Sequence, residues 1–404
     1  MGERPGEEAA PTATVQTHGE TDSTLDAAAH GVIPGPEHSL TGRQASIDIV
    51  RALGVLAVVF YHYSYRFPPD YLHGGTHVEA FAYGRLGVNL FFIISAFCIS
   101  GSLDRSRSAV QFFAKRVARL YPAYVFCVLV TFAAVAAFGL PGREVSTAVL
   151  LGNLVWVNMV LPLRHVDGAY WTLLVELRFY AVIGLLYFAL RRDYDRVTLF
   201  WRVLTLVGIA LYFVAKASAG TPAAGVLRPV AANLFLHPFA GYFLLGITLF
   251  RWERVTARGR ATDVALFVAG VLCSDYGVGD KIVCLCFFPL TYGLLRTQGL
   301  RVPRVVLSVG LVSYPLYLLH QNIGLVVMRT TWPAIDPFVL RALLAFGVVL
   351  LGAFAVNYRI EPPLRRPFER ALVRAGDAVT RRLTGAPPPV PKREADRARG
   401  EDAA

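Results

Sequence analysis

The sequence predicts an all-α polytopic membrane protein, with about ten transmembrane helices and one short segment that crosses only part of the bilayer. The chain has 404 residues, of which 55% are hydrophobic and only 17% are charged. Its mean hydropathy is +0.48. The apolar residues are gathered in runs long enough to cross a hydrocarbon core about 30 Å thick. A soluble domain of this size would carry more charge and shorter apolar runs.

Ten apolar runs have the length of a membrane crossing, within the usual spread of helix length and tilt. They cover residues 46–66, 85–101, 120–139, 171–190, 197–217, 229–250, 261–275, 281–295, 305–328 and 337–357. A further run, 145–161, is short and marginal. We expect it to form a re-entrant or half-spanning segment, which must be shielded by protein or line a cavity.

The basic residues predict how these helices are oriented. If 145–161 does not cross, the loops 102–119, 191–202, 251–260 and 296–304 share one side and hold 16 Lys and Arg residues, against 5 in the opposite loops. The positive-inside rule then places both termini in the cytoplasm of a cell with the protein in its plasma membrane. The net charge is +12, and the basic residues behind it fall between the apolar spans. We therefore expect a lipid bilayer and no nucleic acid as partner.

The two ends of the chain differ in composition from its apolar middle. Residues 1–45 are rich in Ala, Thr, Gly and acidic side chains, and no basic stretch is followed there by an apolar core. We therefore expect no cleavable signal peptide. Residues 371–404 mix Arg, Asp and Glu with "GAPPPVP" and cannot bury a core. The expected organisation is one transmembrane domain at 46–370 between two disordered cytoplasmic tails.

The cysteines predict neither a disulfide framework nor a metal site. All five lie in or beside apolar runs, in no metal-ligand spacing. We expect them to be small buried side chains and expect no metal. There is also no phosphate-binding loop and no dinucleotide fingerprint, which argues against an ATP-driven pump.

A cation and an imidazole share one side of the first predicted helix. Arg51 and His62 are eleven positions apart in "IDIVRALGVLAVVFYHYSYRF", so they lie within about 20° of one face and about 16 Å apart along the axis. Charges in a crossing helix are costly, so this face is expected to meet a polar interior. His62 is either an interfacial histidine of an aromatic belt or a general base that deprotonates a hydroxyl. Its shared face with Arg51 favours the general base.

Two arginines lie one turn apart where the third predicted helix leaves the cytoplasmic surface. Arg116 and Arg119, in "AVQFFAKRVARLYPAYVF", are spaced at i and i+3, so their guanidinium groups can converge on a polyanion such as a phosphate chain. The alternative is that both side chains only reach for the membrane surface.

A carboxylate lies inside the fourth full-length run, slightly below the expected outer surface. Glu176, in "YWTLLVELRFY", could be a structural partner for Arg51 or Arg178, the more common fate of intramembrane acids. It could instead orient His62 or bind a sugar hydroxyl.

A polar stripe follows one face of the ninth predicted crossing. Ser313, Tyr317 and His320, in "SVGLVSYPLYLLHQNIG", are spaced at i, i+4 and i+7, and Pro315 is expected to kink the helix. The stripe should point into the bundle. There it either lines a substrate cavity or joins helices to one another.

Taken together, these segments resemble the acyltransferase 3 family of membrane O-acyltransferases. The matching pieces run in order from about 46 to 367: Arg51 and His62 with ten residues between them, "GRLGVNLFFIISAFCIS", Arg116 and Arg119 as Arg-x-x-Arg, "YWTLLVELRFY", "SYPLYLLH" and "YRIEPPLRRP". Ala96 stands where the family usually has a glycine, and Thr172 where it usually has a serine. Only some 40 residues follow the last predicted helix, so we expect the stand-alone form without an appended esterase-like domain.

The resemblance implies acyl transfer from cytoplasmic acyl-CoA, most simply acetyl-CoA, to an acceptor hydroxyl. The acceptor would be a sugar, a cell-surface glycan or a glycosylated secondary metabolite such as a macrolide. Arg116 and Arg119 would hold the nucleotide phosphates, while His62, assisted by Glu176 and Arg51, would form the catalytic group. We expect direct transfer, because no Ser or Cys nucleophile stands beside His62.

Two other classes of function compete with this interpretation. A secondary transporter or exporter of a sugar-containing or lipid-linked molecule would also have buried charges, but it should show an inverted repeat or paired broken helices, which the sequence does not. A non-catalytic membrane scaffold would have no use for Arg51 and His62 on one inward face.

Overall fold

Helices form all the regular structure of the described chain, as the long apolar runs predict. The computed structural model describes residues 42–74, 78–159, 161, 163–297 and 300–384, and within these ranges no strand occurs. Because only helices and closed barrels satisfy their backbone hydrogen bonds in lipid, long apolar helices make this an all-α polytopic membrane protein.

Four long helices in the first half of the chain carry most of the predicted site residues. They are α2 (Gly42–Ser64), α3 (Gly87–Asp104), α4 (Ala109–Phe138) and α6 (Trp171–Ala189). Two 3₁₀ helices, η1 (Pro69–Leu72) and η2 (Glu79–Leu86), connect α2 to α3. Helix α4 begins after Ser108, whose hydroxyl accepts a hydrogen bond from the backbone N–H of Gln111. This N-cap defines the start of the helix that carries Arg116 and Arg119 in its later turns.

The run at 145–161 contains no helix long enough to cross. Helix α5 (Thr147–Leu154) has eight residues and therefore rises only about 12 Å. It is followed by the 3₁₀ turns η3 (Val157–Met159) and η4 (Gly168–Tyr170), the second of which leads directly into α6. The segment thus has the short, non-crossing form that its composition predicts.

The second half of the chain starts with five helices. They are α7 (Tyr194–Ala217), α8 (Pro222–Asn233), α9 (Ala240–Phe250), α10 (Ala257–Leu272) and α11 (Val278–Arg296). The prediction of a single helix over 229–250 is wrong, because the chain breaks between α8 and α9. Pro238 causes this break, since a proline has no N–H and disfavours the helical conformation of the residue before it. Leu236, two residues before it, has a positive φ of 53°.

A bent pair of helices follows, as the proline in the ninth run predicts. Helices α12 (Arg304–Leu311) and α13 (Ser313–Thr330) meet at 75°. Pro315 lies in the first turn of α13 and has no N–H to bond the carbonyl of Leu311. At the same bend α12 packs closely on α2. The backbone of Gly310 lies so near the carbonyl oxygen of Asp48 that any Cβ at this position would collide with it.

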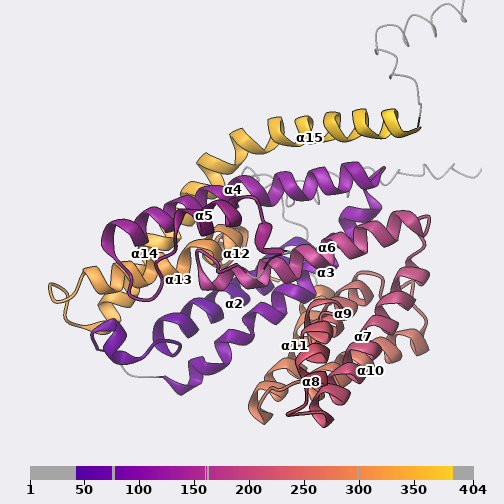
Figure 1. Cartoon of the computed structure of the whole chain (residues 1–404), viewed down its shortest axis with the longest axis horizontal. Helices are drawn as coiled ribbons and strands as arrows, with labels where there is room; N and C mark the ends of the chain where they lie inside the picture. The colour runs from indigo at the N-terminus through magenta and orange to yellow at the C-terminus, as the bar shows by residue number, and fades with distance from the viewer. Residues whose placement is uncertain (1–41, 75–77, 160, 162, 298–299, 385–404) are drawn as a thin grey trace, which may run out of the picture.

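The chain then returns through α14 (Phe338–Ala355), a π-helical turn η5 (Val356–Ile360) and α15 (Glu361–Thr384). Figure 1 shows α15 alongside α4. Helix α15 passes the expected domain boundary at 370, so residues 371–384, expected to be disordered, are helical. Residues 42–45 of the expected N-terminal tail belong to α2. The remaining tail residues, 1–41 and 385–404, lie outside the described part of the chain.

The number of crossings is smaller by strict length than the ten apolar runs suggest. Within the described residues, seven helices are long and apolar enough to cross a membrane, or eight if α12 and α13 form one bent span. The runs 229–250 and 261–275 account for the difference. Helices α8, α9 and α10 have 12, 11 and 16 residues, which is short for independent crossings.

The buried apolar side chains form two clusters. Most of one comes from α3, α6, α7, α9, α10 and α11, and most of the other from α2, α4, α13 and α14. In Figure 1 the helices α7 to α11 gather at the lower right, α13 and α14 lie at the left, and α4 runs across the upper part. Polar side chains of α2, α3, α4 and α6 face one another between the two groups.

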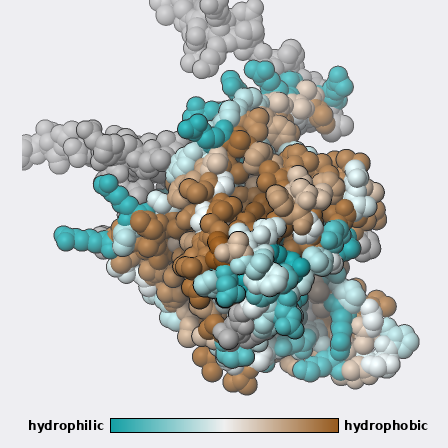
Figure 2. All heavy atoms as spheres, turned by 90° about the vertical axis from the view of Figure 1, so that its left-hand side faces the viewer, coloured by the Kyte–Doolittle hydropathy of each residue, from teal (hydrophilic) through white to brown (hydrophobic). Residues whose placement is uncertain are grey.

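The outer surface of the bundle is apolar along several helices. Leu199, Val203 and Leu206 of α7 and Leu344, Val348 and Leu351 of α14 are exposed large hydrophobic side chains, spaced by about one helical turn. Figure 2 shows hydrophobic residues over much of one face, with hydrophilic residues in its lower part and along its outline. In a membrane protein such stripes are the surface that meets lipid.

Candidate active site

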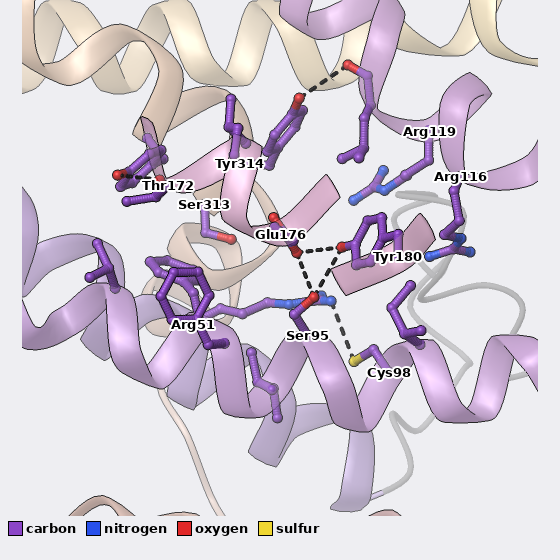
Figure 3. A pocket seen from close by; sticks show the side chains of 18 of the residues that line it. Arg51, Ser95, Cys98, Arg116, Arg119, Thr172, Glu176, Tyr180, Ser313 and Tyr314 are labelled. Carbon is purple, nitrogen blue, oxygen red and sulfur yellow. Dashed lines mark hydrogen bonds between the residues drawn. The ribbon is translucent and has the colours of Figure 1, made fainter. Parts of the chain in front are cut away.

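A pocket lies where α2, α3, α4, α6 and α13 come together. Its volume is about 120 Å³. Six of the eight site residues that the sequence predicts line it, namely Arg51, Arg116, Arg119, Glu176, Ser313 and Tyr317. Figure 3 shows the arginines of α2 and α4 entering this pocket from two sides. Segments far apart in the sequence thus converge on one polar space inside the bundle.

Glu176 is held in this pocket by two hydroxyl groups. Ser95 of α3 donates a hydrogen bond of 2.5 Å to Oε1 of Glu176, and Tyr180, one turn along α6, donates to the same oxygen. The two hydroxyl oxygens are also 3.0 Å apart. Figure 3 shows the three side chains pointing toward one another. The carboxylate is therefore fixed by Ser95 and Tyr180. The partners that the sequence suggests for it are Arg51, Arg178 or His62.

Arg51 lies beside this network but is held only loosely. Its guanidinium group is 3.5 Å from a carboxylate oxygen of Asp48 and 3.6 Å from Sγ of Cys98, both longer than a strong charge-assisted contact. Asp48 lies one turn before Arg51 on α2, whereas His62 lies eleven residues after it. The cation therefore belongs to the pocket, and it does not meet the imidazole that shares its helix face.

The two arginines of α4 differ in the hydrogen-bond partners of their guanidinium groups. Arg119 donates to Oε1 of Glu361 at 2.6 Å, and Arg365 approaches the same oxygen at 3.4 Å. By contrast, Nε of Arg116 is buried and has no hydrogen-bond partner among the described residues. A buried cationic N–H without an acceptor is costly. This end of the pocket therefore has an excess of positive charge and an unsatisfied donor, which suits an anionic ligand.

His62 and His320 form a hydrogen-bonded pair outside that pocket. Nδ1 of His62 is 2.9 Å from the carbonyl oxygen of Val58 and 3.1 Å from Nε2 of His320. Nδ1 of His320 in turn is 2.7 Å from the carbonyl oxygen of Tyr317. Carbonyl oxygens only accept, so both Nδ1 atoms carry a proton and Nε2 of His320 accepts from His62. This arrangement leaves Nε2 of His62 without a proton, able to act as a base.

The stripe of α13 thus has two kinds of neighbour. Ser313 and Tyr317 line the pocket, and the Tyr317 hydroxyl donates to the carbonyl oxygen of Ala169 at 3.0 Å. His320 is fully buried against His62. The stripe therefore both lines a cavity and joins helices.

A second cavity lies on the other side of the histidine pair. Its volume is about 470 Å³. It is lined by Arg66, Phe67, Tyr71, Pro141, Gly142, Arg143, Arg164, His165, Val166, Gly168 and Asn322. The ring of Phe67 is 6.3 Å from that of His62. Residues at the ends of α2 and α4 and before α6 form it, so it lies toward the opposite end of the bundle from Arg116.

Several residues of the site escaped the sequence analysis. Ser95, Tyr180 and Glu361 lie in the segments "FFIISAFCIS", "ELRFY" and "YRIEPPLRRP", which do carry the family resemblance, but nothing in their spacing says that they meet. The second cavity had no sequence signal, because its residues come from loops without periodicity. Among the residues that the structure describes, no group of three or more His, Cys, Asp and Glu side chains could hold a metal ion.

Comparison with known proteins shows which family the chain matches. The family model described as an acyltransferase domain matches residues 44–358. Nodulation protein 10 of Rhizobium leguminosarum bv. viciae is 25% identical over 374 residues, which cover 82% of this chain and 98% of that protein. The O-acetyl transferase of Shigella phage Sf6 is 24% identical over 329 residues, covering 77% of this chain and 93% of that protein. No solved structure matches the chain.

Proposed function

This chain is a member of the acyltransferase domain family, and from that premise we propose that it moves an acyl group from cytoplasmic acyl-CoA to an acceptor hydroxyl, with His62 as the general base. That the protein is a membrane acyltransferase follows from the family and from its apolar helices. The family also favours an enzyme over a transporter. The donor, the acceptor and the roles of individual residues are the proposal.

The first pocket supports acyl-CoA as the donor. Arg116 has an unpartnered buried Nε, and Arg119 lies one turn away on the same face of α4. Guanidinium groups in this spacing suit a diphosphate, because each can donate two parallel hydrogen bonds. Arg51 lines the same pocket further along, where it would contact the donor's pantetheine arm. Its position beside Asp48 and Cys98 supports a contact with the donor, and stabilisation of the oxyanion by the same guanidinium is also part of the proposal.

The single observation that carries the reaction is the hydrogen-bonded pair His62 and His320. With Nδ1 of His62 donating to Val58 and His320, Nε2 can accept the proton of an acceptor hydroxyl as its oxygen attacks the thioester carbonyl. The tetrahedral intermediate then collapses, the carbon–sulfur bond breaks, and the CoA thiolate takes the proton from the imidazolium. His320 positions the imidazole and helps to disperse its positive charge.

The acceptor and the location complete the proposal. The relative from Shigella phage Sf6 is named an O-acetyl transferase, which supports an acetyl group as the acyl unit and a hydroxyl as the acceptor. A sugar, a cell-surface glycan and a sugar-bearing macrolide all fit. The excess of Lys and Arg in alternate loops supports the plasma membrane, with both termini cytoplasmic.

The experiment that tests the donor uses the purified full chain in lipid nanodiscs. Acetyl-CoA binding is measured by calorimetry for the wild type, for Arg116→Ala and for the exposed control Arg228→Ala. The proposal expects binding in the wild type and the control, and at least about tenfold weaker binding in Arg116→Ala. Equal affinity in all three proteins would contradict it.

A further inference from the structure

The second cavity carries positive charge that no neighbouring acid neutralises by an ion pair. Arg66, Arg143 and Arg164 all line it. Arg143 donates to Oδ1 of Asn322 at 2.9 Å, and Arg164 donates to the carbonyl oxygen of Gly142 at 3.1 Å. Within the described residues none of the three forms an ion pair with a carboxylate. Most of their donors are therefore available to a ligand.

The acids and the histidine near this cavity are committed elsewhere. Asp167 accepts from the backbone N–H groups of Ala169 and Asn322, and burial raises the pKa of its carboxyl to about 6. The carboxylate of Glu144 accepts hydrogen bonds from the backbone N–H groups of Leu140 and Arg143. Burial lowers the pKa of His165, which is therefore neutral at pH 7. The charge that a ligand meets is consequently that of the arginines.

Buried asparagines hold the loops that carry these arginines. Asn153 of α5 donates to the carbonyl oxygen of Arg164 at 2.9 Å and accepts from the backbone N–H of Val166 at 3.3 Å. Asn322 of α13 donates to the carbonyl oxygen of Val166 at 2.9 Å. The cavity is therefore organised before a ligand arrives, which favours specific binding.

An aromatic platform connects the cavity to the histidine pair. The rings of Phe67 and Tyr71 are stacked with their centroids 5.5 Å apart, and the guanidinium of Arg143 lies 4.6 Å from the centre of the Phe67 ring. The ring of His62 is 6.3 Å from that of Phe67. A ligand in the cavity beside this cluster would meet the arginines with its charged group and could extend a hydroxyl past Phe67 toward the imidazole.

We infer that this cavity is the acceptor site and that it takes a sugar-like acceptor carrying an anionic group, either a carboxylate or a phosphate. The inference rests on the proposed function only in treating the molecule bound beside His62 as the acceptor. The charge preference itself rests on Arg66, Arg143 and Arg164. Ligand binding can therefore test it without any acyl transfer.

The test uses three probes and the full chain in nanodiscs, without acyl-CoA. The probes are methyl glucoside, methyl glucoside phosphate and methyl glucuronide, which share a sugar ring and differ in charge. Affinities are measured by saturation-transfer NMR for the wild type and for the double variant Arg66→Gln and Arg164→Gln. Both arginines are exposed at the rim, so their loss spares the core. Arg228→Gln, an exposed arginine outside the cavity, is the control.

We expect the wild type and the control to bind at least one anionic probe about tenfold or more tightly than methyl glucoside. The tighter anion identifies a carboxylate or a phosphate. The double variant should lose this preference, and added salt should weaken it in the wild type. The inference is overturned if the neutral probe binds as tightly as both anions, if no probe binds, or if the double variant keeps the preference.

One further variant separates this inference from the proposed function. His62→Ala should keep the preference for the anionic probe over methyl glucoside, because the arginines are unchanged. If His62→Ala transfers acyl groups normally, the proposed base is wrong while the anion site stands. If His62→Ala lacks transfer but the probes show no charge preference, the base stands and the anion site falls.

Discussion

Nε2 of His320 lies 3.1 Å from Nδ1 of His62, and these two residues are 258 positions apart in the sequence. The first belongs to α13 and the second to α2, so the contact depends on the packing of the whole bundle. Because His320 is itself fixed by the carbonyl oxygen of Tyr317 at 2.7 Å, the proton on His62 is directed to Nδ1. The reactive Nε2 is left available.

The first prediction concerns His320 as a positioning residue. His320→Leu removes the acceptor for His62 and should lower kcat by about ten- to a hundredfold, with little change in KM for acyl-CoA. His320→Gln can still accept a hydrogen bond through its amide oxygen and should recover part of the loss. Steady-state kinetics of both variants provide the measurement. Equal defects in Leu and Gln would mean that His320 only fills space.

The second prediction concerns the arginines of α4. Arg116→Ala should raise KM for acyl-CoA, and Arg116→Lys should rescue it poorly if the contact is bidentate. Arg119→Ala is harder to interpret alone, because it also removes one of the two arginines that pair with Glu361. Glu361→Gln is therefore the matched variant, since it breaks the same pair without removing a cation from the pocket. An unchanged KM in Arg116→Ala would leave the pair as a membrane-surface anchor.

The third prediction concerns Glu176. Its carboxylate accepts from Ser95 and Tyr180, so Glu176→Gln should keep the protein folded but disturb this network and lower turnover. Thermal unfolding and kinetics of Glu176→Gln and Ser95→Ala separate the two roles. A structural carboxylate would lose melting temperature and activity together, whereas a role in transfer would spare the melting temperature. A stable, fully active Glu176→Gln protein would exclude both.

The fourth prediction concerns topology. Helix α5 is too short to cross, so the loop after α6 should face the cytoplasm. The loop after α9 should face the same side only if α8 and α9 together cross the membrane as one broken span. In that case cysteines placed at the exposed residues Arg191 and Arg258, in a background without the native cysteines, should both react with an impermeant maleimide only from the cytoplasmic side. A cysteine at Arg228 should react only from outside. Labelling of Arg191→Cys from outside would overturn the proposed orientation.

Much of the fold follows from local sequence, because a crossing helix needs a long apolar run and little else. Helices α2, α4, α6 and α7 lie where hydropathy predicts them. The break between α8 and α9 was missed because the run from 229 to 250 stays apolar on both sides of Pro238. Apolar length alone does not show whether a proline ends a helix or only bends it.

The sequence predicts which site residues share a face of one helix, but not how the helices bring these faces together. Spacing on one helix places Arg116 beside Arg119 and puts Arg51 and His62 on one face, but it cannot show which helix each face meets. The partners of His62 and Glu176 are His320, Ser95 and Tyr180, and the helices that bring them together are distant in sequence. Glu176 thus has hydrogen-bond partners other than His62, and its part in the reaction together with His62 stays a prediction.

The central claim is that His62 removes the proton of the acceptor hydroxyl. The most direct test measures acetyl transfer by His62→Ala and the wild type in nanodiscs, with an acceptor found by comparing extracts of cells with and without the protein. His73→Ala, in the loop after α2, is the control. We predict that His62→Ala lowers kcat by about two to four orders of magnitude while acetyl-CoA binding and folding stay unchanged. A folded His62→Ala protein that transfers acetyl groups at nearly the wild-type rate would contradict the account.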